Sequence, residues 1–84
     1  MSYSLLVLRR AQRELTSLSQ ETYDKVKSAI AALAENARPS GCRKLTGREG
    51  WRIRVGAYRV IYEVDDPART VTILHVGHRR DIYR

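Results

Sequence analysis

Residues 51–64 read WRIRVGAYRVIYEV, and this stretch decides the expected fold. Apolar and polar residues alternate on both sides of a central Gly-Ala pair, which is typical of two β-strands joined by a two-residue turn. Glycine at the first turn position suits a type II′ hairpin. Such a turn fixes the pairing of the strands, so we expect Val55 to face Tyr58 and Arg54 to face Arg59.

The register divides the side chains of the hairpin into two faces. One face is apolar and suited to contact with helices. It carries Trp51, Ile53, Val55, Tyr58, Val60 and Tyr62. The opposite face carries Arg52, Arg54 and Arg59. Like charges directly opposite on a sheet cost on the order of 0.2–1 kcal/mol, so stability alone does not favour Arg54 opposite Arg59. A bound anion would offset that cost; the alternative is a solvated face whose arginines reach apart into water.

The segment before the hairpin predicts one strand and two helices. Residues 3–8, YSLLVL, form an apolar run that ends at an arginine, which indicates a short buried strand. Helical spacing of apolar residues predicts a first helix over 9–18 and, with Ser19 as N-cap, a second helix that ends before Pro39. The apolar stripe of the second helix comprises Tyr23, Val26, Ile30, Leu33 and Ala37.

The second half of the chain predicts further strands. We expect a short strand at 42–45 and a longer one at 70–76, after the turn formed by residues 65–68. The order β-α-α-β-β-β-β predicts an α+β fold, with an N-terminal strand and a helical hairpin packed on a mostly antiparallel sheet of about four to five strands. At 84 residues, the chain is expected to form one domain over 1–84.

The last predicted strand carries His75. With a five-residue turn after Val64, His75 is expected across from Arg59 on the basic face. A histidine in such a place is more often structural or solvated than catalytic. His78 stands beside two arginines, which disfavour its protonated form, so it is a candidate neutral base.

Charge and composition restrict the classes of partner. The formal net charge is +7, with thirteen Arg and three Lys against nine Asp and Glu. Anionic partners are therefore expected: nucleic acid, an acidic protein segment or a membrane surface. A membrane surface normally selects a basic amphipathic helix with exposed large apolar residues, which the sequence lacks. The N-terminal apolar run is too short for a signal peptide or a membrane span, so we expect a cytoplasmic protein.

The chain has a single cysteine, Cys42, and no Cys/His cluster with metal-ligand spacing. Neither a disulfide nor structural zinc is therefore expected, and we predict no metal and no cofactor. A chain this short then depends on tight packing, or on a partner that stabilises the folded form by binding to it.

Two C-terminal pieces resemble a known family. Residues 58–64, YRVIYEV, and 76–84, VGHRRDIYR, are similar to the C-terminal half of RelE-type toxins of the RelE/ParE superfamily. The predicted helical hairpin is similar to the N-terminal half of those toxins. The resemblance implies the toxin of a type II toxin-antitoxin system, with a RelB-like antitoxin as partner. It also implies a metal-independent endoribonuclease, an mRNA interferase, which enters the A site of the ribosome and cleaves mRNA by attack of a 2′-hydroxyl on the adjacent phosphate.

The resemblance also implies roles for individual residues. Arg59 and Arg79 look like the phosphate-stabilising arginines of the family, and Tyr83 looks like its catalytic tyrosine. The basic residues that cluster from 38 to 59, seven against one acid, become candidates for RNA binding together with a C-terminal arginine. The predicted RNA-binding residues are Arg43, Lys44, Arg48, Arg52, Arg54 and Arg80.

The chain departs from the family pattern at two positions. Arg52 and Arg54 stand where the best-known members carry lysines. A lysine can lose its proton and act as a base, whereas arginine stays charged. We therefore expect Arg52 and Arg54 only to bind charge, and proton abstraction to fall to Tyr83 or His78.

Two other functions remain open from the sequence. ParE-type members resemble this fold but act by binding DNA gyrase, without nuclease chemistry. The set Arg59, Arg79 and Tyr83 distinguishes the nuclease from such members, which generally lack it as a complete set. The second alternative is a degenerate member that only binds RNA or an antitoxin through its charge.

Overall fold

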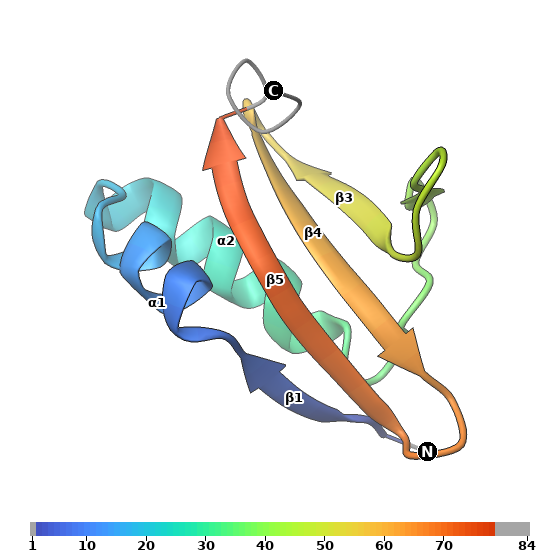
Figure 1. The fold of residues 1–84 in the computed structure, drawn as a ribbon. Coiled ribbons are helices and arrows are strands. Elements are labelled where there is room, and N and C mark those ends of the chain that lie inside the picture. Colours follow the sequence, from blue (N-terminus) through green and yellow to red (C-terminus); the bar gives the residue numbers. More distant parts are fainter. Residues whose placement is uncertain (1, 79–84) are drawn as a thin grey trace.

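The computed structural model describes residues 2–78 and contains two helices and a sheet (Figure 1). The elements in chain order are β1 (Ser4–Val7), α1 (Arg9–Thr16), α2 (Gln20–Ala32), β2 (Arg43–Lys44), β3 (Trp51–Val55), β4 (Tyr58–Asp65) and β5 (Thr70–His78). Within the described residues, one five-stranded sheet has the order β1-β5-β4-β3-β2. Only the β1–β5 pair of this sheet is parallel. The predicted α+β fold with a mostly antiparallel sheet is confirmed.

The β3–β4 hairpin has the predicted register. Val55 pairs with Tyr58 and Arg54 pairs with Arg59. Gly56 has a φ of 61°, while Ala57 has no positive φ, as a type II′ turn requires. The apolar face of the hairpin packs against α2 and joins the core, whose buried members are Ala11, Val26, Ile30, Leu33, Ala37, Ile53, Val60, Tyr62, Val71, Ile73 and Val76. We call the opposite face of the sheet, away from α2, the outer face.

The two helices follow the predicted pattern but end earlier. Ser19 caps α2, because its side chain accepts a hydrogen bond from the Thr22 backbone N–H at 3.3 Å. After Ala32 the backbone tightens: Leu33 N donates to Ile30 O, an i to i−3 bond typical of a 3₁₀ turn. Leu33 and Ala37 are still buried, so the apolar stripe continues past the helix. No helix within residues 2–78 is both long and apolar enough to cross a membrane.

The expectation of a buried strand at 3–8 is wrong. β1 is exposed along most of its length: Leu5 is 37% exposed and Leu6 54%, and only Val7 is half-buried. The physical reason is its place at the edge of the sheet, where it pairs with β5 alone. An apolar run identifies a strand but does not distinguish a central one from an edge strand.

The predicted pairing of His75 with Arg59 is also wrong. The turn between β4 and β5 is tighter than expected, since Asp65 pairs with Thr70, and a β-bulge then interrupts the pairing between Ile61 and Tyr62. Tyr62 pairs with Ile73 and Ile61 with His75, so Leu74 is the extra residue. His75 nevertheless lies on the outer face, as predicted, because it is the neighbour of Ile61 rather than of Val60.

Gly50 closes the turn between β2 and β3, and its backbone geometry excludes other residues. Its φ is 120°, and an added Cβ would lie 3.1 Å from both Leu45 Cδ1 and the carbonyl oxygen of Tyr62. We expect Gly50→Ala to destabilise the protein by about 1–3 kcal/mol, measured by chemical denaturation. Gly47→Ala is the matched control, since its φ is 74° but no atom lies within 4 Å of the added Cβ. Equal stability of the Gly50 variant and the wild type would contradict this account.

Asp66 connects three parts of the chain. Its Oδ1 accepts a hydrogen bond from Tyr3 Oη at 2.6 Å, and its Oδ2 lies 2.9 Å from Arg38 Nη2. The hydrogen bonds from Arg38 and then Tyr3 lower the pKa of Asp66 below its ordinary value of 3.8. The start of β1, the segment after α2 and the β4–β5 turn therefore meet at one carboxylate.

The lowered pKa of Asp66 gives a pH dependence of defined sign. A carboxyl group with a depressed pKa in the folded state stabilises that state above its ordinary value of 3.8, and this contribution is lost as the pH falls through the folded-state pKa. We expect Asp66→Asn to be less stable than wild type at pH 7, and the difference to disappear at the acid end of a pH series of thermal melts. A difference that persists undiminished below the folded-state pKa would contradict the assignment.

Candidate functional site

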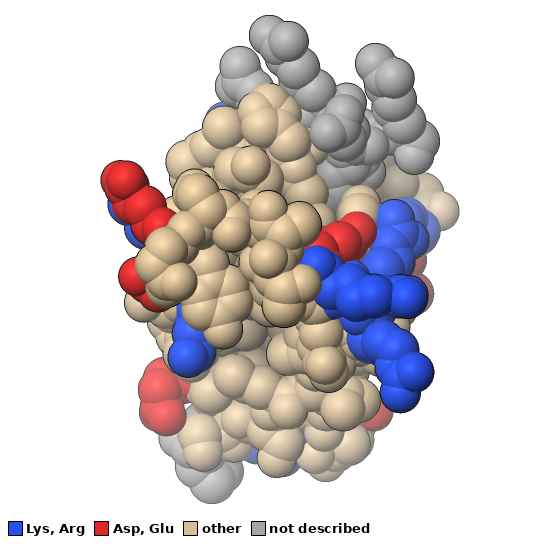
Figure 2. Space-filling model, turned by 90° about the vertical axis from the view of Figure 1, so that its left-hand side faces the viewer, with Lys and Arg blue, Asp and Glu red and all other residues tan. Residues whose placement is uncertain are grey.

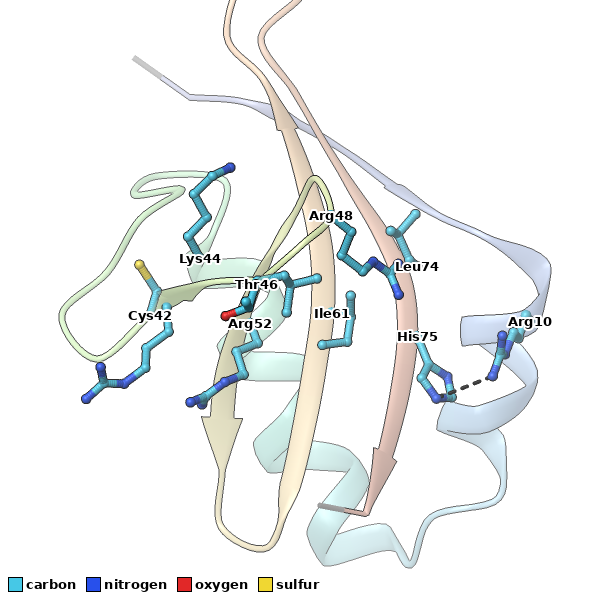
Figure 3. Close-up of a pocket in the computed structure, with 11 residues that line it drawn as sticks. Arg10, Cys42, Lys44, Thr46, Arg48, Arg52, Ile61, Leu74 and His75 are labelled. Carbon is cyan, nitrogen blue, oxygen red and sulfur yellow. Dashed lines mark hydrogen bonds between the residues drawn. The ribbon is translucent and has the colours of Figure 1, made fainter. Parts of the chain in front are cut away.

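The outer face carries a row of residues from four adjacent strands. Arg43 of β2 pairs with Arg52 of β3, Arg52 pairs with Ile61 of β4, and Ile61 pairs with His75 of β5. Neighbouring strands lie about 4.8 Å apart, so the row forms a continuous strip across the sheet. A hollow of about 850 Å³ lies over this strip (Figure 3). Its lining consists of Arg10, Cys42, Arg43, Lys44, Leu45, Thr46, Arg48, Arg52, Ile61, Leu74 and His75.

The lining of the hollow is strongly cationic. Five Lys and Arg residues of α1, β2, β3 and the β2–β3 loop contribute to the lining, and the described lining residues include no carboxylate. The Lys44 ammonium turns to the other face of the sheet, 5.4 Å from the centre of the Trp51 ring, so the cations of the hollow are arginines. Glu49 is the acid of the loop; it is 91% exposed and lies 3.9 Å from Lys44. Figure 2 shows Lys and Arg side chains gathered along the right-hand edge of the view, on the side of the sheet away from α2. A concave surface with charge of one sign concentrates the field and attracts polyanions.

Apolar residues form the floor of the hollow. Ile61 is only 5% exposed although it belongs to the outer face, and Leu74 lies beside it on β5. Figure 3 shows Arg48 reaching from the β2–β3 loop over β4 toward Leu74. Low-dielectric surroundings strengthen the attraction between an arginine and a phosphate compared with open water. The hollow therefore combines an apolar floor with a cationic rim.

Glu14 fastens α1 to the rim of the hollow at β5. Its Oε1 accepts a hydrogen bond from the Val76 backbone N–H at 2.8 Å. Its Oε2 lies 2.6 Å from His75 Nδ1 and 3.2 Å from Arg10 Nε. Arg10 Nη2 in turn lies 3.3 Å from His75 Nε2. Since β1 pairs with β5 only as far as Ile73, Glu14 supplies the acceptor that an edge strand would otherwise provide.

Two of the predicted arginines lie outside the hollow. Arg59 is on the outer face of β4 but only 8% exposed, and its partners across the sheet are Arg54 and Gly77. Arg54 is exposed and lines a separate depression of about 490 Å³ beside the end of α2, which Arg43 and Arg52 also border. The predicted RNA-binding residues are thus split between two neighbouring concave surfaces.

The sequence matches a protein-family model over residues 5–83. That family is the ParE toxin of the type II toxin-antitoxin system, parDE. The chain belongs to this toxin family. The toxin is 50% identical over 42 residues to Toxin RelG of Mycobacterium tuberculosis, a match that spans 46% of RelG and thus less than half of its length.

Solved RelE structures share the fold of this RelE/ParE-type toxin. The M. tuberculosis toxin-antitoxin complex RelBE2 is 27% identical with a TM-score of 0.83, covering 94% of this chain and 100% of that one. The Pyrococcus horikoshii RelE-RelB complex is 26% identical with a TM-score of 0.85, covering 96% and 99%. The isolated Escherichia coli RelE toxin is 26% identical with a TM-score of 0.80, covering 98% and 92%.

The structure describes only some of the predicted catalytic residues of the toxin. His78 pairs with Tyr58 on the apolar face of the sheet, where the two rings meet edge to face with centroids 5.5 Å apart. The structure therefore does not bring His78 into the hollow. Arg79, Arg80 and Tyr83 lie outside the described residues.

Sequence reasoning missed two residues of the toxin's hollow. Arg10 belongs to α1. The sequence indicated its position only through the adjacent arginines Arg9 and Arg10 at the start of a predicted helix, because one of two adjacent helical residues can face the sheet. His75 was expected on the basic face but was assigned no catalytic role, because a histidine in such a place is more often structural or solvated and the sequence does not fix its tautomer. Four predicted residues, Arg43, Lys44, Arg48 and Arg52, do line the hollow.

Proposed function

We propose that this toxin is a RelE-type endoribonuclease that cleaves mRNA in the ribosomal A site and so inhibits translation in the cytoplasm. The observation that carries the proposal is the hollow on the outer face, which is lined by the arginines Arg10, Arg43, Arg48 and Arg52, with no carboxylate among the described lining residues. An RNA backbone is a chain of phosphates that such a surface attracts. Similarity to RelE structures over more than nine-tenths of the chain supports the same conclusion.

The proposed reaction uses the RNA's own nucleophile. The 2′-oxygen attacks the adjacent phosphorus, the bond from phosphorus to the 5′-oxygen breaks, and a 2′,3′-cyclic phosphate and a 5′-hydroxyl result. The crowded phosphorane carries more negative charge than the ground state, so cations fixed beforehand lower the barrier. In the proposal Arg43, Arg48 and Arg52, which line the hollow, supply that charge in place of a metal ion, and Lys44, whose ammonium lies over the Trp51 ring, binds the RNA outside the hollow.

The remaining residues receive roles in the same proposal. Arg59 and Arg79 stabilise the phosphate, Tyr83 moves a proton, and Arg54 and Arg80 extend the contact with the RNA backbone. His78 is the weakest member of the set, since it lies on the other side of the sheet. Because Arg59 is only 8% exposed, its role in the proposal requires the scissile phosphate to approach β4 closely.

A RelB-like antitoxin is the proposed protein partner. The related RelE chains of M. tuberculosis and P. horikoshii were solved as complexes with their RelB antitoxins. With a net charge of +7, this toxin favours an acidic segment, and such a segment laid on the hollow would exclude RNA by competing for the same arginines.

Primer extension on a defined mRNA in purified ribosomes tests the proposal. We expect discrete cuts at the A-site codon with wild-type toxin and markedly fewer with Arg59→Ala. We expect the same mRNA without ribosomes to stay intact, because the described lining residues include no aromatic side chain on which an isolated base could stack, and beyond them the sequence offers Tyr83. Uncut mRNA on ribosomes, with a folded sample that binds its antitoxin, would rule the nuclease out.

Gyrase inhibition is the second candidate function. The observation that favours it is the family model itself, which describes a ParE toxin. A supercoiling assay with purified gyrase separates the two. Inhibition of supercoiling without mRNA cleavage would establish the ParE-type activity in place of the nuclease.

A further inference from the structure

The bulge in β4–β5 determines which face of the sheet His75 occupies. Without the bulge, the pairing set at the turn would continue with Leu74 opposite Ile61, and His75 would lie opposite Val60 on the core side. With it, His75 lies opposite Ile61 on the outer face and lines the hollow. Bulges interrupt the ladder at a cost and often re-aim a side chain next to an active site. The interruption here moves an imidazole from the core to a cationic surface.

The surroundings of His75 fix its orientation. Arg10 can only donate hydrogen bonds, so Nε2, 3.3 Å from Arg10 Nη2, is an acceptor and the neutral ring carries its proton on Nδ1. Nδ1 lies 2.6 Å from Glu14 Oε2, although its N–H direction is poorly aligned with that oxygen. The main effect of Glu14 on the ring is therefore attraction of an imidazolium charge. The Val76 N–H holds the other carboxylate oxygen at 2.8 Å.

We propose that His75 is the general base of the cleavage reaction and that Glu14 is its positioning residue. The inference rests on the proposed ribonuclease function and gives proton abstraction to His75 in place of Tyr83 or His78. The Arg10 side chain is 65% exposed, and in the reaction it turns to the RNA phosphate and releases Nε2. Nε2 of neutral His75 then accepts the proton of the attacking 2′-hydroxyl as the bond from the 2′-oxygen to phosphorus forms. The bond to the 5′-oxygen breaks, and that oxygen takes a proton from water. The imidazolium that results lies against the Glu14 carboxylate, and it returns its proton to solvent after the reaction.

The other groups that face His75 suit this assignment. Arg10 from α1, Arg48 from the β2–β3 loop and Arg52 from β3 carry fixed positive charge and cannot act as bases. They bind the phosphate next to His75. Among the described residues, Glu14 is the carboxylate within ion-pair distance of His75, and it offsets the charge that proton transfer creates. The arrangement follows the logic of a carboxylate, a histidine and a hydroxyl nucleophile, with the hydroxyl supplied by the RNA.

The test measures the single-turnover rate of cleavage of ribosome-bound mRNA at saturating toxin. We expect His75→Gln to lower this rate on the order of 100-fold or more, with affinity for ribosomes unchanged. Glu14→Gln keeps an acceptor for Val76 N–H but loses the charge, so we expect a rate lower by about tenfold with an unchanged melting temperature. Glu21→Gln, on the exposed side of α2, is the matched control and keeps the wild-type rate. Added imidazole is expected to restore part of the rate of His75→Ala.

The outcomes separate this inference from the proposed function. Wild-type cleavage together with an undiminished rate in His75→Gln would overturn the role of His75 and leave the nuclease intact. If Glu14→Gln weakens ribosome affinity or lowers the melting temperature but leaves the single-turnover rate unchanged, Glu14 only stabilises the contact between α1 and β5 and does not position His75. Failure of the wild-type toxin itself to cleave would instead overturn the proposed function.

Discussion

Replacing both Arg48 and Arg52 with alanine is expected to lower cleavage of ribosome-bound mRNA by at least about 100-fold, since each charged hydrogen bond to phosphate contributes about 1.5–3 kcal/mol. The two side chains enter the hollow from different elements, Arg48 from the loop and Arg52 from β3. A tenfold change corresponds to about 1.4 kcal/mol, so two lost contacts suffice for this effect. Initial cleavage rates over a series of salt concentrations measure it, and the double variant should also show a weaker salt dependence.

The matched control for that experiment is Arg9→Ala together with Arg13→Ala. Both residues lie on α1, outside the lining of the hollow, and their loss changes the net charge by the same amount. If cleavage falls equally in both double variants, net charge alone attracts the RNA, and the hollow has no special role.

Tyr62→Ala is expected to destabilise the protein by about 3–5 kcal/mol, the usual cost of removing a buried aromatic side chain. Tyr62 is fully buried in the core, and its hydroxyl donates a 2.8 Å hydrogen bond to the carbonyl of Ala37. Burial raises the pKa of Tyr62 well above its ordinary value, so the ring stays neutral over the accessible pH range. A chain of 84 residues has a total stability of about 4–13 kcal/mol, so this variant should be partly unfolded at 37 °C.

Tyr62→Phe separates the ring from the hydroxyl. It keeps the packing and leaves the Ala37 carbonyl without this donor, so we expect a loss of about 1–2 kcal/mol. Urea denaturation followed by circular dichroism measures both variants. A Tyr62→Ala protein as stable as Tyr62→Phe would contradict the central place of this ring in the core.

The hairpin shows how far local sequence determines the fold. A two-residue turn with glycine in first position leaves one register for Val55 and Tyr58, and from it follow the apolar face and the arginine face. The positions of Arg43, Lys44, Arg48 and Arg52 in one hollow follow from the same short-range geometry, because β2 and its loop adjoin β3. Contacts between neighbours in the chain are thus the ones that residue spacing predicts well.

The parts that sequence reasoning missed depend on contacts between distant segments. The β4–β5 bulge places His75 opposite Ile61 and lies next to Tyr62 and Ile73, which are buried in the core, and no pattern in the sequence of β5 marks its position. Leu6 belongs to an apolar run that predicts a buried strand, yet it is exposed because β1 lies at the edge of the sheet. Arg10 and Glu14 meet His75 across about sixty-five residues of chain, so their cooperation is visible only once α1 is placed against β5.

The central claim is that the hollow on the outer face promotes RNA cleavage by the RNA's own 2′-hydroxyl. The most direct test places a single 2′-deoxynucleotide at the cleaved position of a ribosome-bound mRNA and analyses the ends of the products. The account predicts cleavage of the all-ribose mRNA to a 2′,3′-cyclic phosphate and a 5′-hydroxyl, and no cleavage at the deoxy position. Cleavage of the deoxy-substituted mRNA at an undiminished rate would contradict it, because the attacking oxygen would then have to come from elsewhere.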